Sequence, residues 1–524
     1  MAPTFCNRCG IAIEEECDLL DELAELDALL ERLRLKRYDL KRKINQFHSP
    51  IIRQLPPDIM STIFEFCLPD FTDHYLTPYS GDDLSFPLSL GAICSYWREI
   101  AWSTPSLWSS LVVRVPSQRD SHIVTGIARE WLARSGQLPL SIRISSRSYN
   151  KTVSALANIV NRYSTRWSDL DLYIPDHYFQ RFHAPDNYAP ILKSIRFCCS
   201  FRAKMKLNFH LTCPRLERAN LMCFPMDGSN IQWDNLTHLT LHSTSINDSF
   251  LILRSTTRLV FCEVSGSCPG NGEPSIGKLV LTSLRSLQLL ITSSAEDYLN
   301  NIIAPHLEEF SLPNYYNRAI MGIITSFFRR SACSLRSFSM IFSIFPPYFE
   351  GYMNLLQSMP SLNTLSIISI TTIAEYYYNT EDYDPRNILQ LVAKVLSSQS
   401  TSLQQGFLPN LKILEYTGEL YLRPGNYDYL YSLPPADNAV HVPLHLLKLN
   451  ITQHRIPKNM ISYLSSLVER GITVNVLSDW VSEDILQSSI DYYRCKKDFL
   501  CRDWTDNWDS SLFLDFCGAP GISN

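Results

Sequence analysis

The stretch Leu236-Thr237-His238-Leu239-Thr240-Leu241 places leucine at its first, fourth and sixth positions. Residues 284–289 repeat this spacing with the same three leucines. Because side chains alternate between the two faces of a strand, the fourth and sixth positions point the same way. Degenerate copies, written as first/fourth/sixth position, are Trp167/Leu170/Leu172, Leu192/Ile195/Phe197, Leu216/Ala219/Leu221, Leu259/Cys262/Val264, Leu307/Phe310/Leu312, Leu335/Phe338/Met340, Leu362/Leu365/Ile367, Leu411/Leu414/Tyr416 and Leu444/Leu447/Leu449.

The distance between copies indicates the kind of repeat. Most successive first positions lie 20 to 28 residues apart, close to the about 20–29 residues of a leucine-rich repeat. Each such unit forms one short parallel strand and a return limb. The sequence therefore predicts an α/β fold in which an irregular leucine-rich-repeat solenoid carries a curved parallel sheet. One gap of 49 residues, after Leu362, predicts an insertion or a degenerate unit.

The repeats depart from a regular leucine-rich pattern after their last apolar position. A regular repeat has Asn or Cys three residues later, where this chain has Phe224, Thr244 or Ser343. Ser and Thr bond neighbouring backbone groups less well than an Asn ladder does, and Phe does not bond them at all. We therefore expect uneven coils.

Polar residues stand between the buried positions of the strands and should line the concave face of the sheet. They are of mixed charge, which is compatible with a recognition surface for a protein client and equally with the solvated face of a sheet. The candidates are Asp169, Asp171, Tyr173, Arg218, Asn220, His238, Thr240, His242, Ser286, Gln288, Glu309, Ser311, Glu415 and Lys448.

Residues 1–48 contain a long amphipathic helix. Its apolar seam has one series at seven-residue spacing and a second series four residues after it, interrupted by Arg37. The seam comprises Leu19, Leu23, Leu26, Leu30, Leu33, Leu40, Ile44 and Phe47. The first half of the helix is acidic and the second half basic. The seam predicts either a coiled coil with a second copy or a partner, or packing on the same protein; an antiparallel homodimer through residues 19–47 would match acidic to basic halves.

Residues 49–115 predict a compact helical module. Leu55-Pro56-Pro57-Asp58 is a helix start, because proline suits the first turn and Asp complements exposed backbone N–H groups. Residues 69–87 are polar and predict a loop. One helix is expected on each side of that loop, ending near Thr104-Pro105. The apolar positions at helical spacing are Ile59, Ile63, Phe64 and Cys67, then Leu90, Ile93, Cys94, Trp97, Ile100 and Ala101.

This module resembles an F-box, particularly the fungal type that follows a short coiled coil. The resemblance rests on Leu55-Pro56, then Cys94-x-x-Trp97-Arg98, then Pro105-x-Leu107-Trp108, in that order and spacing. The insertion at residues 69–87 is longer than in a minimal F-box. The repeats are similar to the irregular leucine-rich repeats that often follow F-boxes.

The resemblance implies that the module binds a Skp-type adaptor, which joins a cullin and RING ubiquitin ligase. Matched to the family motif, the adaptor-binding candidates are Leu55, Pro56, Ile59, Ile63 and Phe64, with Leu90, Ile93, Cys94 and Trp97 in that face or in the core of the module. Periodicity alone leaves open that all of these residues are internal core.

The expected boundaries are 1–48 for the tail and helix, 49–115 for the F-box, 116–477 for the solenoid and 478–524 for a C-terminal cap. The solenoid includes an acidic, tyrosine-rich insertion at about residues 371–386. Such a loop suits adaptable contacts with a basic partner and equally a surface excursion. A final helix and strand are expected between Asn450 and Leu477.

Composition excludes several classes of protein. The 524 residues include 47 Lys and Arg against 52 Asp and Glu, and a net charge of −5 gives no general attraction to nucleic acid. No apolar run of about eighteen residues or more indicates a membrane span. The 15 cysteines and an acidic start without an apolar leader favour the cytoplasm or nucleus over a secreted disulfide scaffold.

Motifs of catalysis are largely missing from the sequence. Cys6, Cys9 and Cys17 would need a fourth zinc ligand, and His48 lies beyond the helix, so we expect no metal and no cofactor. Residues 272–279 have Walker spacing but carry Leu279 where Ser or Thr should bind magnesium. The resemblance to an F-box therefore implies a non-catalytic substrate receptor of a ubiquitin ligase for protein degradation; the alternative is a ligase-independent scaffold, and a hidden enzyme ranks last.

Overall fold

The computed structural model describes the chain with gaps and divides it into two compact units, Met1–Asn235 and Leu236–Asn524. The described residues are 13–48, 55–68, 86–115, 121–147, 149–199, 209–224, 226–266, 277–291, 295–313, 319–342, 354–369, 408–418, 444–451, 456, 458–469, 471–478 and 481–499. The expected insertion at 371–386, the tyrosines within it and the tail from residue 500 lie outside these ranges.

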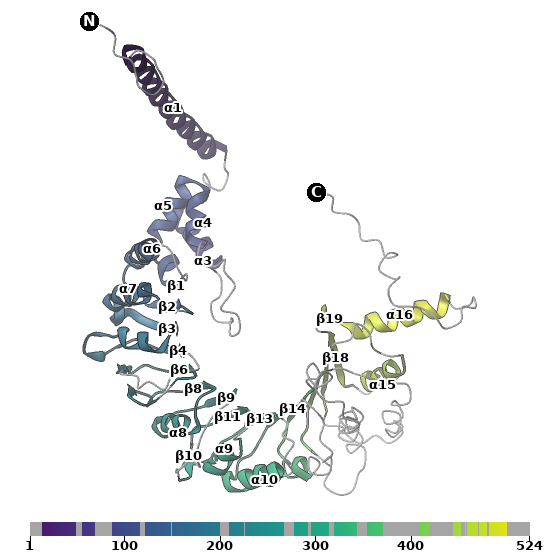
Figure 1. Cartoon of the computed structure of the whole chain (residues 1–524). Helices are drawn as coiled ribbons and strands as arrows, with labels where there is room; N and C mark the ends of the chain where they lie inside the picture. The colour runs from purple at the N-terminus through teal and green to yellow at the C-terminus, as the bar shows by residue number, and fades with distance from the viewer. Residues whose placement is uncertain are drawn as a thin grey trace. The chain divides into compact units, whose positions relative to one another are not determined.

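The first unit begins with one long helix, α1 (Ile13–His48), drawn in purple in Figure 1. Every side chain between residues 22 and 44 is exposed, and this includes the seam leucines. In this part of the helix, the seam therefore does not pack on the rest of the same protein.

Short helices follow α1: α3 (Pro57–Phe66), α4 (Phe86–Ile93), α5 (Ser95–Ser103) and the 3-10 turn η2 (Pro105–Trp108). The expectation of one continuous helix through residues 90–101 is wrong. Cys94 has extended backbone angles, φ −157° and ψ 168°, and separates α4 from α5. The predicted end of the helix near Thr104-Pro105 is confirmed.

Parallel strands of the first unit follow in chain order, each beside its predecessor: β1 (Ser110–Arg114), β2 (Leu140–Ser145), β3 (Trp167–Tyr173), β4 (Ser194–Cys198) and β6 (Arg218–Met222). Helices α6 (Ser121–Arg134) and α7 (Lys151–Val160) lie on one side of them (Figure 1). The expectation of helices alone up to residue 115 is corrected, because β1 lies within that range.

The return limbs of the first unit are irregular, as the uneven repeats predicted. Some contain short 3-10 turns, and one contains a two-stranded side sheet. These elements are η3 (Asn161–Arg166), η4 (Asp176–Arg181), η5 (Pro185–Asn187) and the parallel pair β5 (Phe209–Leu211) with β7 (Ser229–Ile231).

Parallel strands also follow in chain order in the second unit, where they form a curved sheet (Figure 1). They are β8 (His238–His242), β9 (Phe261–Ser265), β11 (Ser286–Leu290), β13 (Glu309–Pro313), β14 (Ser337–Phe342), β15 (Thr364–Ser369), β16 (Ile413–Gly418), β17 (Leu446–Ile451) and β18 (Thr473–Ser478). The mixed α/β class with a large parallel sheet is confirmed.

Helices and a small side sheet occupy the return limbs of the second unit. They are α8 (Ile246–Ser255), α9 (Ala295–Asn301), α10 (Ala319–Ser331), α15 (Lys458–Glu469) and the pair β10 (Leu279–Val280) with β12 (Ile302–Ile303). The first three helices lie on one side of strands β8 to β13 (Figure 1). The expected final helix and strand are α15 and β18.

The strand register confirms the repeat pattern of the sequence. Leu239 pairs with Cys262, which pairs with Leu287, and the same fourth position continues through Phe310 and Phe338 to Val474 in β18. The sixth positions pair in the same way on both sides of the β11–β13 pair, whose register ends at Gln288 and Ser311. Almost no surface of these side chains is exposed, so they form the apolar core of the unit.

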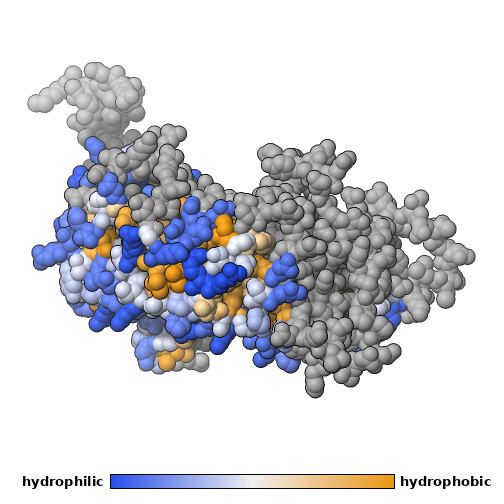
Figure 2. Space-filling model, turned by 90° about the horizontal axis from the view of Figure 1, so that it is seen from below, coloured by the Kyte–Doolittle hydropathy of each residue, from blue (hydrophilic) through white to orange (hydrophobic). Residues whose placement is uncertain are grey.

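The last parallel strand is followed by β19 (Val481–Asp484), which pairs with it antiparallel, and by α16 (Ile485–Phe499). A strand paired along the edge of a sheet occupies backbone groups that could otherwise pair with another chain. The face in Figure 2 intersperses apolar residues among hydrophilic ones. No helix within the described ranges has both the length and the apolar character needed to cross a bilayer.

Candidate functional site

An exposed apolar stripe runs along α3. The helix begins after Pro56, whose carbonyl accepts from the Met60 N–H at 3.1 Å, and Pro57 occupies its first turn. Ile59 is 45% exposed, Ile63 40% and Phe66 87%. These positions are four, then three, residues apart and share one face of the helix. An apolar face that remains in water is a candidate for contact with another protein.

The opposite face of α3 holds the module together. Met60 and Phe64 are buried, and the Phe64 ring lies 5.0 Å from that of Trp97. Phe64 is therefore core, and Trp97 is half-buried beside it. Both belonged to the predicted adaptor-binding set, so the structure separates that set into core residues and exposed residues.

The break at Cys94 separates α4 from α5 and lies directly after another exposed apolar residue. Its Sγ accepts a hydrogen bond from the Trp97 backbone N–H at 3.4 Å and caps α5. Ile93, just before the break, is exposed, while Leu90 is buried in the module. Gly91 allows α4 and α5 to approach closely, because a Cβ there would lie 2.1 Å from the Trp102 ring.

The remaining predicted adaptor contacts lie at the start of α3. Pro56 is exposed and Leu55 half-buried, and the Leu55 carbonyl accepts from the Tyr96 hydroxyl at 3.4 Å. Phe66, the most exposed member of the stripe, was not among the predicted contacts. Its signal was its place seven residues after Ile59, on the same helical face.

Trp108 fixes the helices to the first strand. It is buried, and its Nε1 donates to the Ala101 carbonyl at 2.7 Å. Its ring contacts those of Trp102 and Trp131 edge-on, at centroid distances of 5.2 and 4.8 Å. Trp131 in α6 in turn donates to the Ser110 carbonyl of β1 at 3.0 Å. Through the contact of Phe64 with Trp97, α3 and its stripe are thus connected by way of α5 to the first strand.

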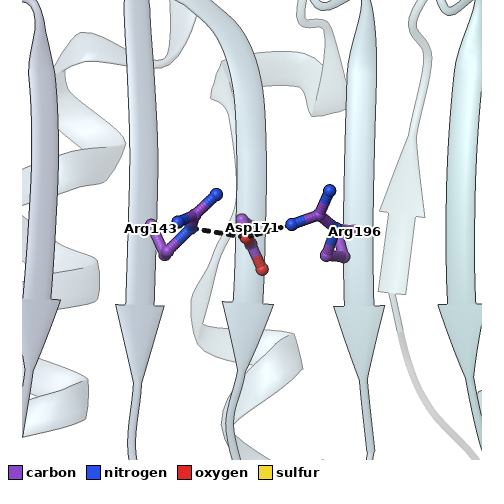
Figure 3. Close-up of polar contacts among 3 residues, drawn as sticks. All are labelled: Arg143, Asp171 and Arg196. Carbon is purple, nitrogen blue, oxygen red and sulfur yellow. Dashed lines mark hydrogen bonds and ion pairs between the residues drawn. The ribbon is translucent and has the colours of Figure 1, made fainter. Parts of the chain in front are cut away.

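A second candidate surface is the polar face of the strands in the first unit. Asp171 of β3 lies between two arginines (Figure 3): its Oδ2 accepts from Arg143 Nε of β2 at 2.7 Å and from Arg196 Nη1 of β4 at 3.3 Å. Ser141 donates to Asp169 at 3.0 Å, and Arg218 lies 3.8 Å from the same carboxylate. Polar side chains thus link four neighbouring strands, β2, β3, β4 and β6.

The structure brings the predicted client-contact residues of this unit onto one face. In the strand register Asp171 lies beside Arg196, and Arg196 lies beside Asn220. Tyr173 is half-buried at the end of β3. Arg196 was not among the predicted residues. It occupies the equivalent position to Asp171, because each directly follows a buried fourth-position residue, Ile195 or Leu170. Arg143 was not predicted either. A register shift between Leu140 and Ser141 leaves β2 one residue short of the repeat spacing, so its strand did not match the pattern.

In the second unit the polar face has a different chemistry. His242 Nδ1 lies 3.0 Å from Ser265 Oγ, and Glu263, another missed residue, lies between β8 and β11 in the register. Desolvation by burial raises the pKa of Glu263, although His242 and Ser265 both act to lower it. Thr240 and Gln288 are its half-buried register partners.

The other predicted positions of this unit divide among exposed, paired and buried. His238 is exposed and stacks on Phe261 at 5.9 Å, and Glu309 is exposed beside the half-buried Ser311. Lys448 Nζ donates to Glu415 at 2.8 Å. Ser286 lies beside Phe261 and Glu309 in the register, on the polar face as expected, but its side chain is buried there.

Several thiols of the described chain are buried and neutral. Burial raises the pKa of Cys198, Cys213 and Cys262 to about 12. At neutral pH these groups are protonated, and a protonated thiol is neither a strong nucleophile nor a metal ligand. No group of three or more His, Cys, Asp or Glu side chains in the described parts of the chain is arranged to hold a metal ion. Cys6 and Cys9 lie outside those parts.

The geometry thus offers two interaction surfaces, the apolar stripe on α3 and the polar strand face centred on Asp171. Neither assembles an acid, a base and a nucleophile in one place. Comparison with protein-family models and with curated proteins found no match to this chain.

Proposed function

We propose that this chain is the substrate-recognition subunit of a Skp-cullin-F-box ubiquitin ligase, acting in the cytoplasm or nucleus. The observation that carries the proposal is the division of α3 into two faces. Met60 and Phe64 are buried in the module, whereas Ile59 and Ile63 are left in water. The exposed pair follows the Leu55-Pro56 opening by which the module resembles an F-box.

In this proposal the apolar stripe docks on a Skp-type adaptor, and through it on cullin and RING subunits. Burying two exposed isoleucines and Phe66 in a partner provides apolar binding energy, at roughly 25 cal/mol per Å² removed from water. Trp108 and its neighbours keep the stripe fixed relative to β1, so that the distance from adaptor to strand face stays constant.

The client is proposed to bind the polar strand face. Arg143 and Arg196 present planar donors there, and Asp171 orients both. A client held at a fixed distance from the ubiquitin-loaded enzyme meets it as an intramolecular reactant, which is the source of the rate gain. This chain would supply binding and position, and the reacting groups would belong to its partners.

The deciding experiment is co-expression of the full chain with a Skp-type adaptor, followed by size exclusion with light scattering. We expect a one-to-one complex for the wild type. Ile59→Glu with Ile63→Glu should weaken it at least about tenfold, because two charges would enter an apolar interface. The matched control is Ile127→Glu, an isoleucine 46% exposed on α6, which should leave the complex intact.

The same experiment contains the outcomes against the proposal. A folded wild-type chain that ignores the adaptor would leave the scaffold as the better interpretation. So would a complex that tolerates both glutamates. The exposed seam of α1 favours that second candidate, because it is an interaction surface that needs no adaptor.

A further inference from the structure

The apolar seam of α1 lies open to solvent between residues 22 and 44. Its members are each between 50% and 56% exposed and are Leu23, Leu26, Leu30, Leu33, Leu40 and Ile44. Together with Arg37, which interrupts the apolar series, they recur at alternating spacings of three and four residues, the pattern of a and d positions in a coiled coil. A helix with such a seam buries it against another helix.

The charges beside the seam determine which helix fits. If Leu23, Leu30 and Ile44 occupy a positions, then Glu22 and Lys43 fall at g, and Asp27 and Arg34 fall at e. These flanking positions set partner and orientation. Because the acids stand in the first half and the bases in the second, the helix is complementary to itself only when reversed.

An antiparallel register satisfies both the seam and its flanks. Leu30 of one copy then faces Leu33 of the other, and Leu23 faces Leu40, always an a position against a d position. In this register Asp27 lies beside Arg34 of the second copy, and Glu22 beside its Lys43. Each of these pairs occurs twice through the two-fold axis, and all of them are opposite in charge.

The parallel, in-register alternative is unfavourable at the same positions. It places Glu22 beside Asp27 of the other copy and Lys36 beside Lys41. It also brings the two copies of Arg37 together inside the seam, whereas the antiparallel register sets Arg37 against Leu26 near the acidic half. Like charges in such positions disfavour the wrong partner arrangement.

We propose that α1 pairs with α1 of a second copy of this chain as an antiparallel coiled coil. The proposal goes beyond the adaptor-binding function and does not depend on it. Two ion pairs within the helix compete for the same bases, Arg34 with Glu31 at 3.5 Å and Lys43 with Asp39 at 2.8 Å. All four side chains are exposed, and exposed pairs of this kind stabilise a helix little.

The first test measures the mass of the full chain by light scattering over a series of concentrations. We expect twice the 60.1 kDa of one chain. Glu22→Lys with Asp27→Lys should weaken association at least about tenfold, since both pairs become repulsive. The matched control, Glu25→Lys with Glu31→Lys, makes the same change in charge on the outer face and should leave the dimer intact. Circular dichroism verifies that the helix persists.

A complementary pair of variants tests the charge pattern directly. Arg34→Glu with Lys43→Glu should also fail to self-associate. Mixing it with Glu22→Lys/Asp27→Lys should restore a dimer, because all the flanking pairs become attractive again. A wild type that stays monomeric overturns the proposal, and so does a dimer indifferent to these changes, which would arise from another surface.

Orientation is tested by a photo-reactive residue. With Glu22→p-benzoylphenylalanine, an antiparallel dimer cross-links to the peptide that contains Lys43. A parallel dimer instead cross-links to the peptide that contains Asp27, and that result would overturn the proposal even if the mass is doubled. Because trypsin cleaves between these two segments, mass spectrometry distinguishes them.

Discussion

Arg143 Nε donates a hydrogen bond to Asp171 Oδ2 across 2.7 Å and so ties β2 to β3 on the polar face of the sheet. Arg196 of β4 approaches the same oxygen at 3.3 Å, so one carboxylate offsets the charge of two guanidinium groups. The side chain of Asp171 is 20% exposed, so water screens these contacts less than at an open surface.

Asp171→Asn should therefore destabilise the first unit by about 1–2 kcal/mol, since a charge-assisted hydrogen bond is lost and two arginines are left facing each other. Faster hydrogen exchange in β2 to β4 is the measurement. Asp169→Asn is the matched control: its ion pair with Arg218 spans 3.8 Å and is more exposed, so its cost should stay below about 0.5 kcal/mol. Equal effects of the two substitutions would contradict this ranking.

Cys94 gives a second prediction, because its thiol caps α5 by accepting from the Trp97 N–H at 3.4 Å. Cys94→Ala should cost about 1 kcal/mol, as at other helix caps. Cys94→Ser should be neutral or stabilising, because a hydroxyl oxygen accepts a hydrogen bond better than sulfur does. Urea unfolding followed by tryptophan fluorescence reports the difference. An alanine variant as stable as the wild type would show that the cap does not depend on this side chain.

Much of the repeat fold could be predicted from sequence, because the buried positions are fixed by a short local spacing. Leu239, Leu287 and Leu365 occupy equivalent register positions, as their spacing indicated. The first two strands were missed for physical reasons. β1 follows Trp108 inside a segment dominated by helical spacing, and the register shift at Leu140 removes one residue from the pattern of β2.

The candidate surfaces were less predictable. Spacing placed Phe64 and Ile63 in one apolar series, and only packing against Trp97 shows that Phe64 is core while Ile63 is exposed. The break at Cys94 was also hidden. Cysteine is a rare cap, and the apolar series crosses the break without losing its period.

The contacts of Trp108 predict that the helical module and the first strand unfold together. Its buried ring contacts Trp102 of α5 and Trp131 of α6, and its Nε1 donates to the Ala101 carbonyl at 2.7 Å. Trp131 in turn donates to the Ser110 carbonyl of β1. Trp108→Ala should cost about 3–5 kcal/mol, typical of a buried tryptophan. Hydrogen exchange should then rise together in α5 and in β1. Trp108→Phe keeps an aromatic ring in place and should cost less; loss of protection in α5 alone would show that the two parts fold separately.

The burial of Glu263 predicts how the stability of the fold changes with pH. Burial raises its pKa above the ordinary 4.5, so the folded state retains the proton to higher pH than the unfolded state does. Stability contributed by this group is therefore lost as pH rises from 4.5 through the raised value. Glu263→Gln, which stays neutral, should leave stability nearly unchanged at pH 4 and increase it slightly at pH 7. Urea unfolding of both proteins at the two pH values gives the difference between their free energies of unfolding. The contributions of the other titrating groups cancel in that difference. A variant less stable than the wild type at pH 7 would show instead that the contacts with His242 and Ser265 outweigh the cost of burying the charge.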